Sequence, residues 1–352
     1  MHLIKLAAAF VAAAILSSCG GDGNPRIPPP NPGFTSLVSF GDSLSDVGTY
    51  SVGSVKSQGG GKFTVNSPDA KIWIELIAAR MGVSAPCAAQ TGLEGDPAQG
   101  YSAPVTNVTA CTAYAQGGAR VTNPVGPGNR ALGGGNAVIG ELTVPVATQI
   151  QNHLASHGGT FNGSEAVFVM AGANDLLMQL LDVARGEDPL DAVGAMAKAG
   201  VELAVQIRSL ISAGATHVIV VNVPDVSTTP FGQAQAEIQR ELIQVMGRTF
   251  NAALRQGVED RPEILYVDAW ARAREQSDHP AQYGLTNVMS PACDLSPAAN
   301  PLESALICTR ANVVPGVIDR YQFADTVHPT PYGHQLLAEL VSGELTRRGW
   351  LR

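Results

Sequence analysis

Short apolar runs alternate with longer helical patterns along this chain, and this alternation constrains the fold more than any other feature. The runs, most of them rich in β-branched residues, lie at 36–40, 110–115, 166–170, 217–221 and 264–267. The helical patterns lie near 68–81, 144–156, 191–214, 233–256 and 332–348. Continuous apolar strands separated by helices are typical of a parallel sheet that helices cover on both faces. In such sheets, ligands bind at the carboxyl ends of the strands.

The size and composition allow a packed core and disfavour nucleic acid as the main partner. The chain has 352 residues, of which 45% are hydrophobic and 15% charged, with a net charge of −8. Nucleic-acid binding requires an excess of Lys and Arg, and the chain contains no basic cluster. Two stretches, 82–135 and 276–320, are rich in Gly and Pro and show little periodicity. We expect both to be long loops that line the entrance to the site.

The N-terminus has the features of an export signal. Lys5 precedes an apolar run over 6–16 that is too short to span a bilayer, which predicts a signal peptide over 1–18. The run ends in Leu-Ser-Ser-Cys, and this resembles the bacterial lipoprotein box in which the Cys, here Cys19, becomes the lipidated first residue. The alternative is an ordinary secretory signal with an incidental Cys, in which case the protein is secreted.

The segment after the predicted cleavage site indicates how the folded part is attached. Residues 19–33 contain many Gly and Pro, so we expect a tether between a lipidated Cys19 and a single folded domain over 34–352. Residue 20 is Gly20 and not Asp, so the usual inner-membrane retention signal is absent. The resemblance therefore implies the outer membrane, facing the periplasm or the outside. A lipid anchor would be the contact with the membrane.

The other four cysteines fit an exported protein. They allow three pairings, and the pairing local in sequence joins Cys87 to Cys111 and Cys293 to Cys308. Free buried thiols are the alternative, but the predicted compartment favours disulfides. Neither pair has the His neighbours or the spacing of a zinc site, so we predict no metal. No phosphate-binding glycine motif joins a strand to a helix, so we predict no nucleotide cofactor.

Two distant segments carry groups that fit acyl-transfer chemistry. A strand that ends at Gly41 would present Ser43 at the start of a helix, where free N–H groups and a partial positive charge surround the hydroxyl. Far downstream, Asp325 precedes His328 by three residues, so its carboxylate can orient the imidazole from one side. Taken separately, Ser43 has the simpler interpretation of a helix cap, and the Asp–His pair that of a surface pair before the last helix.

Four blocks together resemble the GDSL family of the SGNH hydrolase superfamily, and the similarity extends over residues 35–350. The blocks are 40–46, 114–119, 172–175 and 325–330. The resemblance implies a three-layer α/β/α sandwich with a five-stranded, flavodoxin-like parallel sheet, long loop insertions and ester hydrolysis. A weaker match at 71–76 points to the bacterial lecithinase and haemolysin-like branch of lipases and esterases.

The resemblance also implies a role for each site residue. Ser43 is the expected nucleophile, His328 the general base and acid, and Asp325 the group that orients the imidazole. The expected oxyanion donors are the backbone N–H of Ser43, the backbone N–H of Gly118 (with the preceding glycine as the alternative) and the side-chain amide of Asn174.

These features together predict a serine ester hydrolase of the bacterial cell envelope that acts on lipid or other apolar esters. The same residues would serve a polysaccharide O-deacetylase or an acyltransferase, because loops decide the substrate and the acceptor. From a different functional class, a non-catalytic lipoprotein that binds lipids or glycans is the remaining alternative. All four blocks are intact in this chain, which argues against a retired hydrolase.

Overall fold

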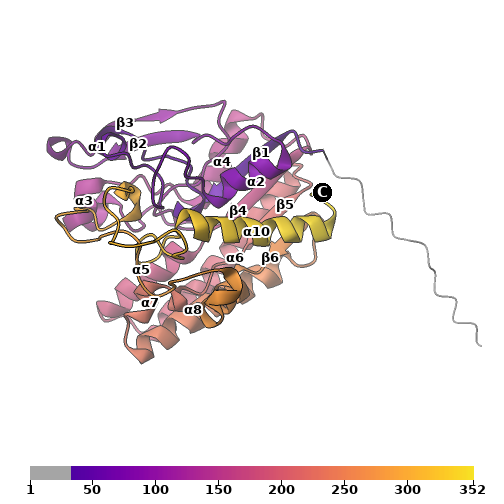
Figure 1. The fold of residues 1–352 in the computed structure, drawn as a ribbon. Helices are drawn as coiled ribbons and strands as arrows, with labels where there is room; N and C mark the ends of the chain where they lie inside the picture. The colour runs from indigo at the N-terminus through magenta and orange to yellow at the C-terminus, as the bar shows by residue number, and fades with distance from the viewer. Residues whose placement is uncertain (1–32) are drawn as a thin grey trace, which may run out of the picture.

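The computed structural model describes residues 33–352, so the predicted signal peptide, Cys19 and nearly all of the tether lie outside the described residues. The centre of the fold is a parallel sheet with the strand order β1-β4-β5-β6 (Figure 1). Its strands are β1 (Ser36–Gly41), β4 (Glu165–Met170), β5 (Val218–Val221) and β6 (Ile264–Val267). All three strand pairings are parallel.

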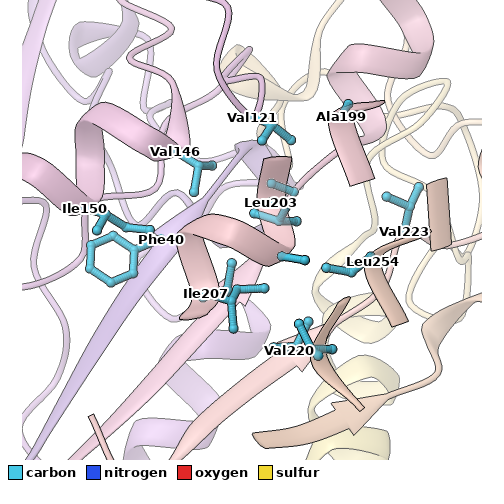
Figure 2. Packing of buried hydrophobic residues seen from close by; sticks show 14 of the residues in the cluster. Phe40, Val121, Val146, Ile150, Ala199, Leu203, Ile207, Val220, Val223 and Leu254 are labelled. Carbon is cyan, nitrogen blue, oxygen red and sulfur yellow. The ribbon is translucent and has the colours of Figure 1, made fainter. Parts of the chain in front are cut away.

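Each strand buries both of its faces, which explains why the strands are continuous apolar runs. Val38 and Phe40 point into one hydrophobic cluster, whereas Leu37 points into the other. The first cluster, part of which Figure 2 shows around Phe40, Leu203 and Val220, is covered by four helices. These are α4 (Val146–Ser156), α5 (Ala173–Ala184), α6 (Pro189–Ser212) and α8 (Glu237–Val258).

Three helices cover the opposite face of the sheet. They are α2 (Trp73–Met81), α9 (Ala269–Asp278) and α10 (Pro331–Arg348). Helices α2 and α10 lie side by side in front of the sheet (Figure 1), where the Trp73 ring packs edge-on against Phe168 of β4. The three layers and the parallel sheet agree with the sequence prediction. Helices α5 and α9 were not predicted.

The prediction of five strands is wrong: within residues 33–352 the sheet has four, and residues 110–115 contribute only two isolated bridges. Ala113 pairs with Ser39 at the open edge of β1. On one side of this bridge, the Thr112 hydroxyl donates to the Leu37 carbonyl. On the other side, the side-chain amide of Gln149 accepts from the Gly41 N–H and donates to its carbonyl. The Gly41 carbonyl also accepts from the Gln116 N–H at 3.1 Å. The side chains of Thr112 and Gln149 thus bond the Leu37 carbonyl and the Gly41 N–H, two groups that a full backbone ladder would pair, and the segment does not form a regular strand.

The two predicted loops differ in content. The first contains the antiparallel hairpin β2 (Gln90–Glu94) and β3 (Ser102–Asn107), and the short helix α3 (Gly134–Ile139) begins at its end. The second contains only the 3₁₀ turns η5 (Pro280–Tyr283) and η6 (Ala305–Ile307) within the described chain. The remaining short elements are η1 (Ser43–Ser45), α1 (Gly53–Ser57), η2 (Pro97–Gln99), η3 (Arg130–Leu132), η4 (Val226–Thr228) and α7 (Pro230–Gln233).

Each loop carries one of the predicted disulfides. Both pairings, Cys87–Cys111 and Cys293–Cys308, are confirmed. Disulfides persist in oxidising surroundings and therefore indicate an extracytoplasmic location. Within residues 33–352, no helix combines the length and apolar character that crossing a bilayer requires.

Candidate active site

The sheet topology brings two of the predicted site segments together. Strands β1 and β4 are parallel neighbours, so the segments that follow them emerge at the same edge. Ser43 follows β1, and Asn174 follows β4. Gly41, the last residue of β1, has φ +153°, and a Cβ atom there would lie 2.1 Å from the Met170 carbonyl oxygen. Only glycine allows the chain to turn this close to β4.

Two buried carboxyls shape the turn that carries Ser43. Asp42 caps this turn by accepting from the Leu44 N–H at 3.1 Å. Asp46 accepts from the Thr49 N–H at 2.7 Å and the Gly117 N–H at 2.9 Å, so it ties the turn to the neighbouring glycine segment. Burial raises the pKa of Asp42 to about 7 and that of Asp46 to about 6, although the N–H donors oppose the rise.

His328 joins the Ser43 hydroxyl to the Asp325 carboxyl. Its Nε2 lies 2.9 Å from Ser43 Oγ, and its Nδ1 lies 2.7 Å from Asp325 Oδ2. With the proton on Nδ1, the imidazole donates to the carboxylate and accepts from the serine hydroxyl. The ring packs on Phe63 with the centroids 4.8 Å apart, which restricts its rotation. The structure therefore brings together the three side chains that the sequence analysis selected from distant segments.

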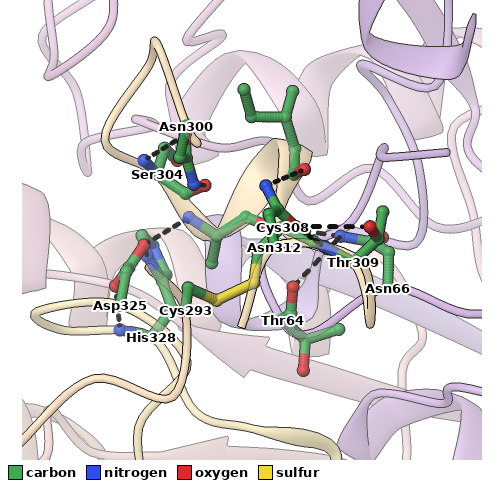
Figure 3. The surroundings of a disulfide bond; sticks show 12 residues. Thr64, Asn66, Cys293, Asn300, Ser304, Cys308, Thr309, Asn312, Asp325 and His328 are labelled. Carbon is green, nitrogen blue, oxygen red and sulfur yellow. Dashed lines mark hydrogen bonds and ion pairs between the residues drawn. A yellow bond between two sulfur atoms is a disulfide. The ribbon is translucent and has the colours of Figure 1, made fainter. Parts of the chain in front are cut away.

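Asp325 is buried and receives four hydrogen bonds, and Figure 3 shows it beside His328. Besides the His328 ring, the backbone N–H groups of Val327 and His328 donate to Oδ1, and that of Ala305 donates to Oδ2 at 2.7 Å. Burial by itself raises the pKa of this carboxyl, but the imidazole and the hydrogen bonds outweigh burial and lower it below the usual value. The carboxylate is therefore ionised at neutral pH and can stabilise a positive charge on His328.

Potential oxyanion donors border Ser43. Among the residues that the structure describes, the backbone N–H groups of Ser43 and Gly118 have no hydrogen-bond acceptor. The Gly117 N–H is already bonded to Asp46, which favours Gly118 between the two glycines. Asn174 donates one amide hydrogen to the Ala119 carbonyl, and its second remains available. All three residues border the same cavity.

A cavity of about 610 Å³ opens above these groups. Its walls are mostly apolar and include the side chains Leu44, Phe63, Ile139, Leu177, Val226, Leu302, Leu306 and Leu337. Long insertions from both predicted loops form part of the wall, as expected. Within residues 33–352, no group of three or more His, Cys, Asp or Glu side chains is arranged to hold a metal ion.

Two residues of this site were missed by sequence reasoning. Phe63, against the His328 ring, lies in a glycine-rich stretch with no periodic pattern. Glu141 lines the cavity as a buried carboxyl, although it follows a glycine in a loop where a solvent-exposed acid would be expected. No local signal marks either residue, because both depend on chain segments that meet only in the fold.

Two solved structures that match this chain over most of its length share little sequence with it. An α/β hydrolase from the metagenome of Lake Arreo, Spain, is 16% identical, with a TM-score of 0.42, covering 90% of this chain and 96% of that chain. A lipase from a goat rumen metagenome is 15% identical, with a TM-score of 0.41, covering 90% of this chain and 99% of that chain.

Two curated proteins are also similar. Lipase 1 of Photorhabdus luminescens is 26% identical over 202 residues, which cover 56% of this chain and 23% of that protein. An uncharacterized protein encoded in the trpE-trpG intergenic region of Pseudomonas putida is 23% identical over 318 residues, 88% of this chain and 48% of that protein. This chain thus spans less than half the length of each relative.

The family assignment rests on a longer match. The profile of the family described as GDSL-like Lipase/Acylhydrolase matches residues 37–341, which include all four blocks and nearly the whole described chain. The prediction of this family is thereby confirmed. This chain belongs to the GDSL-like lipase/acylhydrolase family.

Proposed function

We propose that this protein is a serine carboxylic-ester hydrolase in which Ser43, His328 and Asp325 form the catalytic triad. The observation that carries the proposal is the continuous hydrogen-bonded path from the Ser43 hydroxyl through the imidazole to the Asp325 carboxylate. A serine is a weak nucleophile unless an adjacent base takes its proton, and this path supplies the base together with the group that orients it.

The reaction proceeds in two halves. Ser43 Oγ attacks the ester carbonyl carbon while its proton moves to His328 Nε2, and Asp325 stabilises the resulting imidazolium. The N–H groups of Ser43 and Gly118 and the amide of Asn174 bind the oxyanion that develops on the carbonyl oxygen. When the C–O bond breaks, the leaving alcohol takes the proton from His328. Water activated by the same imidazole then hydrolyses the acyl-enzyme and restores the serine.

The mostly apolar cavity supports lipid or other apolar esters as substrates. We further propose that a lipid on Cys19 and the tether over 19–33 hold the protein at the bacterial outer membrane. The export signal and the two disulfides support this location.

The triad is tested by labelling with a fluorophosphonate, which reacts with activated serines. The protein without residues 1–19 is expected to be labelled at Ser43 and to hydrolyse aryl esters, and Ser43→Ala is expected to lose both. Ser45→Ala, two residues away in the same turn, is the matched control and should retain labelling. Labelling that survives in Ser43→Ala, or its absence in the unmodified protein, would contradict the proposal. The anchor is tested on the full-length protein, in which mass spectrometry of the N-terminal peptide is expected to show a lipid on Cys19.

A further inference from the structure

Glu141 is a buried carboxyl without a partner beside the proposed oxyanion site. Glu141 is only 9% exposed. Within residues 33–352, no group donates a hydrogen bond to its carboxyl and no cation forms an ion pair with it. Buried polar groups in folded proteins are nearly always satisfied. An unpaired acid in the wall of a substrate cavity therefore indicates that the substrate supplies its missing hydrogen bond.

Two glycines hold the carboxyl in place. A Cβ atom at Gly128 would lie 2.5 Å from Glu141 Oε2, and one at Gly118 would lie 3.2 Å from it. The Glu141 N–H also donates to the Gly128 carbonyl at 2.9 Å, which fixes the backbone of the acid. The carboxyl thus packs directly against the glycine that is proposed to donate to the oxyanion.

The carboxyl remains accessible from the cavity. Unlike Nε2 of His334, which is sealed from solvent and unpaired, the oxygens of Glu141 retain some accessible surface. Glu141 forms part of the same cavity wall as Ser43 and Gly118. Its accessible side therefore faces the space in which an ester would lie.

We propose that Glu141 is a specificity residue that hydrogen-bonds a hydroxyl group of the ester substrate. This inference rests on the proposed esterase function and narrows the substrate class to esters that combine an apolar portion with a hydroxyl. The apolar wall suits the hydrocarbon portion, and Glu141 is the buried, unpaired acid within that wall.

The protonation state of Glu141 favours a hydroxyl over a cation. Burial raises the pKa of Glu141 to about 8, and the nearby carboxyl of Asp46 adds to the rise. The acid is therefore largely neutral at pH 7, and a neutral carboxyl both donates and accepts one hydrogen bond. A hydroxyl does the same, whereas an ammonium group only donates.

Two matched substrate pairs test the inference. Propyl hexanoate and glyceryl monohexanoate differ only by hydroxyls on the alcohol, and methyl hexanoate and methyl β-hydroxyhexanoate differ by one on the acyl chain. The readout is the ratio of kcat/KM within each pair, measured by titrating released acid. We expect Glu141→Leu and Glu141→Ala to lower the preference for the hydroxylated ester about tenfold in at least one pair. Glu141→Gln, which still donates and accepts, is expected to retain most of the preference.

Glu303→Gln is the matched control, because Glu303 is an exposed carboxyl in the wall of the same cavity. Its ratios are expected to stay within about twofold of those of the unmodified protein. Ratios unchanged within twofold in both Leu and Ala variants would overturn the inference while leaving the esterase proposal intact. The inference would also be overturned if Glu141 favoured a cation over a hydroxyl. The enzyme would then prefer choline hexanoate to the neutral 3,3-dimethylbutyl hexanoate in a way that depends on Glu141, and it would show no preference for hydroxylated esters. If no ester is hydrolysed and Ser43 is not labelled, both proposals fail.

Discussion

The two disulfide-bonded regions of this molecule are attached to the sheet in different ways. The edge region, residues 87–116, follows β1 through backbone hydrogen bonds: the Ser39 N–H donates to the Thr112 carbonyl, and the Tyr114 N–H donates to the Ser39 carbonyl. The Tyr114 ring also stacks on Phe40, with the centroids 5.4 Å apart. This region leads directly to the glycines beside Ser43, and several separate contacts attach it to β1.

The acid–base region, residues 285–330, pairs with no strand of the sheet. Loop contacts hold it instead: the N–H groups of Gly61, Asn66 and Phe231 donate to carbonyls of this region, those of Leu306, Cys308 and Thr326. Asn66 Nδ2 also donates to the Ala305 and Cys308 carbonyls, and within the region Asp325 accepts from the Ala305 N–H (Figure 3). The nucleophile and the oxyanion donors therefore rest on the sheet and its edge, which form the framework side of the site. The acid and base lie on loops that contact other loops, and the position of His328 depends on the hydrogen bonds of Asp325, so single changes in the acid–base region should cost more activity.

The largest effect is expected from Asp325→Asn. The new amide nitrogen would face the donors of Ala305 and the His328 ring, which forces the imidazole away from the tautomer that accepts from Ser43. We expect kcat for an aryl ester to fall about 10⁴-fold. Asp294→Asn, a carboxyl in the same region away from the triad, should change kcat less than about twofold. A fall below tenfold for Asp325→Asn would remove Asp325 from the triad.

A smaller loss is expected on the framework side, from Asn174→Ala. This change removes one of three proposed oxyanion donors, while the backbone donors of Ser43 and Gly118 remain because no side-chain substitution deletes them. We expect kcat to fall about 10²–10³-fold with KM little changed. Steady-state kinetics with the same ester decide the matter. A loss as large as that of Asp325→Asn would contradict the idea that single changes in the acid–base region cost more activity.

The same contrast explains what could be predicted from sequence. The four strands were predictable because each is a continuous apolar run buried on both faces, and Ser43, His328 and Asp325 because their residue types and motif positions are distinctive. The strand at 110–115 was overpredicted since the competing Thr112 and Gln149 side chains cannot be foreseen from a local pattern.

Two causes account for the other omissions, the polar composition of a helix and contacts between distant segments. Helix α9 (Ala269–Asp278) is strongly polar and gives little apolar periodicity, so it was missed. The environment of Glu141 is formed by Gly118 and Gly128, which approach the acid only after the loop has folded. Contacts between loops that are distant in sequence also hold the acid–base region, which is why its contacts were the least predictable part of the site.

Removing each disulfide in turn tests the comparison directly. The closed loops are of similar size, with separations of 24 and 15 residues, so either Cys→Ser pair should lower the free energy of unfolding by about 3 kcal/mol. The two disulfides should differ in their effect on kcat. Cys293 lies beside the Asp325 segment, its N–H donating to the Ala324 carbonyl, so its loss is expected to lower kcat about tenfold. Loss of Cys87–Cys111 should lower kcat less than about twofold. Equal effects on kcat would refute the difference between the regions.

The smallest expected difference between the framework side and the acid–base region lies in the pH dependence of stability. Asp325 has a lowered pKa in the folded state, so its contribution is present above its unfolded pKa and is lost in acid. Glu141, near Asp46 and Tyr50 on the framework side, has its pKa raised by burial to about 8, so the native state binds the extra proton and stability falls as pH rises towards 8. Chemical denaturation from pH 2 to 9 should therefore show Asp325→Asn flattening the acid limb. Glu141→Gln should reduce the loss between pH 6 and 8 by about 2 kcal/mol. An alkaline limb unchanged in Glu141→Gln would mean that water from the cavity already solvates the ionised carboxyl, and the framework side would then owe its pH dependence to Asp42 and Asp46.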